Sequence, residues 1–271
     1  MTEITLTPIG TSPAWYNPGV PGSGYLLESE GYRLLLDCGS GVIMNYLDRC
    51  GGADAPPIDA VVISHVHLDH VADLVPLVYG IAYGPLGAWS PTLHLPPGAR
   101  ERLQRMVSMW DAPADFFEGS FAVHHYQPGT SFSCGPFQLS ACHVPHFVES
   151  HALRCEVDGI GLGYSADLGP SAAVSSFFAD VDLLLCEATL TDDHHELPAM
   201  RGHLSGAEAG DIAAASNAAQ LLLTHIPDAN DPDGVVRSAK RRYQGPVSIA
   251  TPWESVVIRA HSPRGAVDAS S

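Results

Sequence analysis

Short apolar runs alternate with polar or glycine- and proline-rich stretches along most of the chain. Thirteen runs have the length and the β-branched or aromatic content of strands. They lie at 3–9, 24–27, 32–36, 60–63, 92–95, 121–126, 137–146, 151–157, 160–164, 181–186, 221–223, 247–249 and 256–258. Two joints between them, Glu28–Gly31 and Asp158-Gly159, are typical of hairpin turns.

Segments with helical spacing of apolar residues separate several of these strands. The spacing predicts helices at 42–50, 71–83, 97–110, 206–219 and 232–243. Pro76 lies inside the second of these helices, where we expect it to produce a kink. Ser205 and Glu208 have the spacing of a capping box, which fixes the start of the helix after His203.

Length and composition indicate a globular protein. The chain has 271 residues, of which 45 % are hydrophobic and 16 % charged. We expect a single domain over residues 1–262 and a flexible tail at 263–271. No apolar run approaches the roughly 18 residues that a membrane span needs. The first six residues lack a secretory signal pattern, and the six cysteines include no C-x-x-C pair, so we expect a cytoplasmic protein with reduced thiols.

The charge balance bears on the class of substrate. Thirteen Lys and Arg face 30 Asp and Glu, a formal net charge of −17. Polyphosphates are bound mainly by basic residues, and here the bases cluster only at Lys240-Arg241-Arg242. The balance disfavours long nucleic acids and favours a small-molecule substrate.

The densest group of metal-ligand side chains directly follows the apolar run at 60–63. His65, His67, Asp69 and His70 fall within six residues, where a buried strand ends. His65 and His67 can converge on one cation, while Asp69 and His70 can turn to a second. Imidazole and carboxylate together suit Zn, Mn or Fe. With 14 histidines in the chain a close pair is expected by chance, but this whole pattern after a buried strand is not.

The pattern His65-x-His67-x-Asp69-His70 resembles the signature of the metallo-β-lactamase superfamily. The resemblance spans residues 4–258 and implies an α/β fold, a four-layer αββα sandwich of two mixed β-sheets flanked by helices. It also implies a one- or two-metal centre between the sheets. Five further segments carry it: His146–Arg154, Tyr164–Gly169, Cys186–Ala188, His203–Gly210 and Leu221–Pro227.

Two histidines, His143 and His146, compete for the third ligand position. In the family this ligand stands about eight residues before a basic residue on the next strand, and Arg154 gives His146 that register. His143 lies an odd number of residues before His146 on the same predicted strand, so its side chain should face the other layer. We therefore expect His146 to be the ligand.

The remaining ligands implied by the resemblance are Asp167 and His225. The segment Tyr164–Gly169 resembles a family turn whose aspartate bridges two metals, although Ala166 and Leu168 replace the usual Gly and Thr. His225 follows an apolar run, as His65 does. An acid at the position of Asp37 lies behind the metal ligands in the family.

The resemblance thus implies two divalent metal ions, with zinc favoured over manganese or iron. His65, His67 and His146 would hold one ion, Asp69, His70 and His225 the other, and Asp167 would bridge them. Two such ions hold a hydroxide that serves as the nucleophile. In phosphodiesterase members a histidine at the position of His203 protonates the leaving oxygen. The catalytic roles therefore fall to His203 and Asp69; the alternative for His203 is a surface histidine beside a helix cap.

Within the superfamily the chain is most similar to ribonuclease Z-like phosphodiesterases, and more narrowly to bacterial enzymes that hydrolyse cyclic nucleotides. We expect a phosphodiesterase of small, cyclic-nucleotide-type substrates. One alternative is a tRNA 3′-end endonuclease, although residues 84–119 lack a long basic arm for tRNA. Another is a lactonase or thioesterase of specialised metabolism, which the altered turn at Ala166 and the aromatic pair Trp15-Tyr16 leave open. The resemblance also suggests a homodimer.

Overall fold

The computed structural model describes residues 2–260, so the predicted tail at 263–271 lies outside the described residues. Within this range the strands form two mixed sheets of seven strands each. In order across the first sheet, sheet A, the strands are β14 (Val256–Ile258), β1 (Ile4–Gly10), β2 (Gly24–Ser29), β3 (Tyr32–Leu36), β4 (Ala60–Val62), β5 (Thr92–Leu95) and β6 (Ala122–His125). In order across the second, sheet B, they are β13 (Val247–Ile249), β12 (Leu221–Thr224), β11 (Leu183–Glu187), β10 (Ile160–Tyr164), β9 (Ser150–Val157), β8 (Phe137–Val144) and β7 (Ser131–Cys134).

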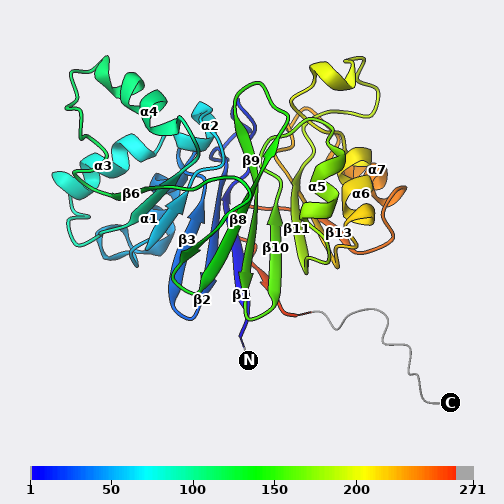
Figure 1. Ribbon diagram of the computed structural model, residues 1–271, viewed down its shortest axis with the longest axis horizontal. Coiled ribbons are helices and arrows are strands. Elements are labelled where there is room, and N and C mark those ends of the chain that lie inside the picture. Colours follow the sequence, from blue (N-terminus) through cyan, green and yellow to red (C-terminus); the bar gives the residue numbers. More distant parts are fainter. Residues whose placement is uncertain (1, 261–271) are drawn as a thin grey trace.

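The two sheets pack face to face and helices cover both outer faces (Figure 1). Sheet A carries α1 (Val42–Cys50), α2 (Leu68–Val71), α3 (Leu74–Ala82) and α4 (Ala99–Ser108). Sheet B carries α5 (Ala172–Phe177), α6 (Gly206–Ala215) and α7 (Pro232–Lys240). Two short 3₁₀ turns lie at 52–54 and 198–200. This is the predicted four-layer αββα sandwich.

Three apolar clusters hold the layers together. The central cluster joins the sheets, and the rings of Tyr25 and Tyr164 meet there with centroids 5.2 Å apart. A second cluster packs sheet A against its helices, and a third does the same for sheet B. Because both faces of each sheet are covered, the central strands are apolar on both sides, which explains their continuous apolar runs.

Both predicted hairpin turns are confirmed. Glu30 and Gly31 join β2 to β3 with φ of 52° and 80°, and Asp158 and Gly159 join β9 to β10 with φ of 48° and 80°. Two consecutive left-handed residues are the geometry that matches the twist of paired strands in a two-residue hairpin. The two glycines and Asp158 adopt it at low cost, which makes the turns predictable from the sequence, while Glu30 is an unusual residue for this conformation.

The predicted helix at 71–83 is wrong in one respect. Val71 ends α2, the helix begins again only at Leu74 as α3, and Pro76 is the third residue of α3. The first four backbone N–H groups of a helix have no partner within it, so a proline there breaks no hydrogen bond and produces no kink. The prediction also missed β7, a polar edge strand, and the short helix α5.

The strands that matter for chemistry are parallel. In sheet A, β3 to β6 run in one direction, and in sheet B, β10 to β13 do the same. Loops that leave the carboxyl ends of β4, β10 and β12 therefore gather at one edge of the sandwich. None of the helices in the described part of the chain combines the length and apolar character that a membrane crossing requires.

Candidate metal centre

All seven predicted ligand residues lie together at this edge. His65 and His67 follow β4, and Asp69 and His70 begin α2. Asp167 and His225 follow β10 and β12. The two sheets meet here directly, since His65 pairs with Ser150 in an isolated β-bridge.

The cluster contains His146, the histidine that the register to Arg154 selected, and does not contain His143. Strand β8 ends at Val144, two residues earlier than expected, so His146 does not lie on the strand. His146 instead lies in the bend after the strand, where its Nδ1 donates to the carbonyl oxygen of Gly202 at 2.7 Å. His143 stays within β8, and its ring faces that of His151, with centroids 5.8 Å apart.

Three histidines form the first ligand group. The Nδ1 atom of His67 lies 3.2 Å from Nε2 of His65 and 3.0 Å from Nε2 of His146. Asp167 Oδ2 completes the group, 3.8 Å from His65 Nε2 and 3.9 Å from His146 Nε2. Three ring nitrogens and a carboxylate oxygen that converge in this way are a suitable ligand set for a divalent cation.

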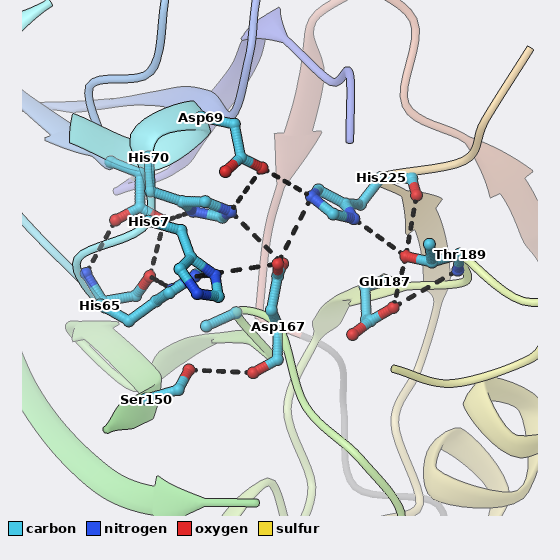
Figure 2. Close-up of polar contacts among 12 residues, drawn as sticks. His65, His67, Asp69, His70, Ser150, Asp167, Glu187, Thr189 and His225 are labelled. Carbon is cyan, nitrogen blue, oxygen red and sulfur yellow. Dashed lines mark hydrogen bonds and ion pairs between the residues drawn. The ribbon is translucent and has the colours of Figure 1, made fainter. Parts of the chain in front are cut away.

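The second group contains Asp69, His70 and His225. Asp69 Oδ2 lies 3.4 Å from His70 Nε2 and 3.2 Å from His225 Nε2. Asp167 also takes part, with Oδ1 3.4 Å from His70 Nε2 and Oδ2 3.5 Å from His225 Nε2. Figure 2 shows Asp167 between the 65–70 turn on one side and His225 on the other, the position of a residue shared by both groups.

The protonation states within the cluster suit cation binding. Burial and the neighbouring histidines lower the pKa of His65, His67 and His146, which keeps their lone pairs free. Burial would raise the pKa of Asp69 and Asp167, but the adjacent His70 and His225 outweigh it and hold both carboxylates ionised. Burial would lower the pKa of His70, but Asp167, Asp37 and Asp69 raise it, so a metal ion would displace a proton from this ring. Neutral imidazoles and ionised carboxylates are the ligand forms that divalent metals need.

An unsatisfied buried atom shows that the residues fit a metal. Within residues 2–260, Nε2 of His70 is fully buried and makes no hydrogen bond. Its other ring nitrogen donates to Asp37 Oδ2 at 2.7 Å, so Nε2 is the nitrogen that points into the second ligand group. A buried imidazole nitrogen without a partner is costly in free energy, and metal coordination removes that cost.

Asp37 supports the cluster from behind, as the sequence predicted. Its carboxylate accepts hydrogen bonds from the backbone N–H and the hydroxyl of Ser64, each at 2.7 Å. Oδ2 also accepts from His70 Nδ1 and from the hydroxyl of Tyr164, again at 2.7 Å. A carboxylate on the far nitrogen of a ligand histidine fixes the ring tautomer and orientation.

Glu187 is a site residue that sequence reasoning did not single out. It ends β11 and is buried. Its Oε1 accepts from Nδ1 of His203 at 3.0 Å, and its Oε2 accepts from the hydroxyl of Thr189 at 2.6 Å. The same hydroxyl oxygen lies 2.9 Å from Nδ1 of His225, so Glu187 links the second ligand group to His203. The sequence feature that could have identified Glu187 is a charged residue at the end of a buried apolar strand.

His203 lies at the margin of the cluster. Its ring stacks on that of His225 with centroids 5.6 Å apart and meets that of His146 edge-on at 5.1 Å. Burial would lower the pKa of His203, but the charge and hydrogen bond of Glu187 raise it to about 9. The predicted capping box is present, since Glu208 N–H donates to Ser205 Oγ and Ser205 N–H donates to Glu208 Oε2. The N-cap residue Ser205 lies two residues after His203, so the cap restrains the backbone close to His203.

Comparison with known proteins identifies the family. A sequence profile described as "Beta-lactamase superfamily domain" matches residues 32–226. The chain therefore belongs to the metallo-β-lactamase superfamily and is a metal-dependent hydrolase by family.

Individual relatives agree with this assignment. The chain is 34 % identical over 234 residues to the "Probable metallo-hydrolase YhfI" of Bacillus subtilis, covering 84 % of this chain and 89 % of that one. The crystal structure of YhfI superposes with a TM-score of 0.83 over 94 % of this chain and 99 % of that one, at 28 % identity. A "Ribonuclease Z" of Bradyrhizobium diazoefficiens is 27 % identical over 309 residues, 94 % of this chain and all of that one.

Proposed function

We propose that this protein is a phosphodiesterase that hydrolyses small phosphodiesters of the cyclic-nucleotide type. The observation that carries the proposal is the Glu187–His203 pair beside the ligand cluster, with Nδ1 of His203 held 3.0 Å from Oε1 of Glu187. An alkoxide is a poor leaving group, so cleavage of a sugar phosphodiester needs a proton donor next to the reaction centre. Hydrolysis of a lactone or a thioester depends less on such a proton donor.

The seven ligand residues would hold two divalent ions, zinc being favoured by the histidine-rich set. When bound, such ions supply an activated water as nucleophile and stabilise the charge that develops on the substrate. His203 carries a proton at neutral pH because Glu187 raises its pKa to about 9, against the effect of burial. Glu187 occupies Nδ1, so Nε2 of His203 is the nitrogen that gives its proton to the leaving oxygen.

The charge distribution supports a small substrate over tRNA. Two of the three residues in the basic cluster form ion pairs, Arg241 with Asp192 at 2.6 Å and Arg242 with Asp211 at 2.8 Å. Carboxylates beside these arginines reduce their attraction for phosphates. The family assignment and the relative named ribonuclease Z nevertheless keep tRNA 3′-end cleavage as the second candidate function.

The aromatic loop gives little support to a lactonase or thioesterase. Tyr16 lines an apolar cavity of about 710 Å³ between its own loop, α1 and α3, and none of the seven ligand residues lines that cavity. The Tyr16 hydroxyl lies 2.6 Å from Ser40 Oγ, which holds the loop against the start of α1. The large apolar cavity is therefore separate from the ligand cluster.

A substrate panel with one variant tests the proposal. The metal-loaded protein is assayed with 2′,3′- and 3′,5′-cyclic nucleotides, bis(4-nitrophenyl) phosphate, a precursor tRNA, a lactone and a thioester. His203→Ala should lose about 10²- to 10⁴-fold in kcat on cyclic nucleotides. It should lose far less on bis(4-nitrophenyl) phosphate, because nitrophenolate leaves without a proton.

His143→Ala is the matched control, a histidine on β8 outside the cluster, and should retain wild-type rates. Equal losses on both substrates in His203→Ala, with metal content unchanged, would exclude His203 as the proton donor. Wild-type turnover of the lactone or thioester alone would exclude the phosphodiesterase.

A further inference from the structure

We infer that Phe147 forms a subsite for a planar aromatic ring, on which the base of a nucleotide substrate stacks. The inference rests on the proposed function. Phe147 directly follows the ligand residue His146, and its side chain is 63 % exposed. An apolar ring left in water forgoes the free energy of burial, so an exposed phenyl beside a reaction centre is available to a ligand.

The ring of Phe147 is held in place from one side. Its centroid lies 5.2 Å from that of His146 and 5.9 Å from that of His203. The glycine at position 202 leaves room for the Phe147 ring. A Cβ atom on residue 202 would lie 2.6 Å from Cε2 of Phe147 and 2.7 Å from Nδ1 of His146, closer than such contacts allow. The phenyl ring therefore lies against the bare backbone of Gly202, and its remaining surface is open.

A ring fixed in this way is a prepared binding surface. Contacts with His146, His203 and Gly202 restrict the phenyl before any ligand arrives, so little conformational entropy is lost on binding. Other exposed large apolar side chains in the described part of the chain, such as Tyr83, Met109 and Trp110, lack these neighbours in the metal cluster. The position next to His203 distinguishes Phe147 from them.

The chemistry of a cyclic nucleotide fits this placement. One sugar separates the base from the ring oxygen that leaves when the cyclic phosphate opens. His203 would protonate that oxygen, and Phe147 is the aromatic neighbour of His203. Stacking on an aromatic side chain accepts every base because each base has a π-face, and a phenyl ring has no donor or acceptor to select among them. We expect broad base preference.

The test compares a nucleoside cyclic phosphate with the cyclic phosphate of a simple diol of the same ring size, which has no base. Phe147→Ala should lower kcat/KM for the nucleoside substrate by roughly 10- to 100-fold. It should change kcat/KM for the base-free substrate by less than about twofold. Phe147→Trp, which enlarges the stacking surface, should keep or increase kcat/KM for the nucleoside substrate only.

Trp110→Ala is the matched control, an exposed aromatic remote from the ligand residues, and should leave both substrates unaffected. Equal losses on both substrates in Phe147→Ala, with metal content retained, would mean that the ring only supports His146 and His203, and would overturn the inference. Wild-type kcat/KM of Phe147→Ala on both substrates would also overturn the inference, and the proposed phosphodiesterase activity would still stand. A wild-type protein that cleaves neither substrate would overturn the proposed function itself.

Discussion

Nδ1 of His203 lies 3.0 Å from Oε1 of Glu187, and this contact joins the ligand cluster to the residue that we propose as the proton donor. The two residues are 16 positions apart and come from different elements, the end of β11 and the approach to α6. Glu187 also accepts from Leu168 N–H at 2.8 Å, directly after Asp167. One carboxylate therefore contacts both the loop that carries Asp167 and His203.

Glu187→Gln should reduce phosphodiester turnover. The amide keeps the shape of the side chain but removes the charge that holds His203 protonated, so we expect kcat to fall about 10- to 100-fold with both metals retained. Steady-state kinetics with a cyclic nucleotide measure this effect. Glu196→Gln, an exposed acid in a neighbouring loop, is the control and should have wild-type kcat. Wild-type kcat in Glu187→Gln would contradict the role assigned to this carboxylate.

Metal stoichiometry should distinguish the bridging ligand from a terminal one. Asp167 faces both ligand groups, whereas His146 faces one. Elemental analysis should therefore find about two ions per wild-type chain, about one in His146→Ala and fewer than one in Asp167→Asn. His143→Ala should retain both ions. Two ions in Asp167→Asn would show that this carboxylate does not bridge.

Asp37→Asn should weaken metal binding without removing a ligand. The amide nitrogen would face donors at His70, Ser64 and Tyr164 in place of an acceptor. We expect 10- to 100-fold lower metal affinity, the usual effect of losing the partner of a ligand histidine. Competition with a coloured chelator measures it. Asp48→Asn, on the exposed side of α1, should bind metal as the wild type does, and equal affinities in the two variants would refute the supporting role.

Acid should remove the stability that Glu208 contributes. Burial would raise the pKa of Glu208, but hydrogen bonds from Arg201 and the backbone of Ser205 outweigh it and lower the pKa below the ordinary 4.5. A carboxyl with a lowered folded-state pKa contributes its full stability above the unfolded pKa. That stability is lost as pH falls below 4.5 and through the folded-state value.

Glu208→Gln should therefore be less stable than the wild type at pH 7, by about 2 kcal/mol, because buried Arg201 loses its charged partner. Thermal unfolding at a series of pH values measures the difference in Tm, which should shrink below pH 4.5. Asp193→Asn, an exposed acid, should unfold as the wild type does at pH 7. A difference in Tm between the wild type and Glu208→Gln that stayed constant down to pH 2 would contradict the prediction.

The ligand residues were predictable because each follows an apolar strand in sequence. Strand ends are set by local patterns, so the positions of His65, Asp167 and His225 after apolar runs could be read from the sequence. The resemblance to the superfamily implied that they meet, because local patterns do not encode how two separate sheets pack. The register to Arg154 selected His146 over His143, and His146 is the one that lies in the ligand cluster. The length of β8 was less predictable, because the strand stops at Val144 and the bend after it orients His146.

Other parts of the site depend on contacts that the local sequence pattern does not encode. The Glu187–His203 contact depends on the relative position of β11 and α6, which no local spacing encodes. Phe147 is an exposed apolar residue, and such residues follow no period. The backbone at Ala166 is left-handed, with φ of 52°, a conformation that glycine adopts more readily than alanine, and the sequence alone could not tell whether the turn survives with alanine.

The pairing of β14 with β1 has a consequence for how the protein must be made. Ile4 lies opposite Ile258 and Leu6 opposite Val256, so one of the earliest strands to be synthesised waits for one of the last. Until β14 is synthesised, the edge of the apolar strand β1 exposes unpaired backbone N–H and C=O groups. These groups can pair with other nascent chains. Shortened versions that stop before Val256 should therefore precipitate during expression even though they contain every metal ligand.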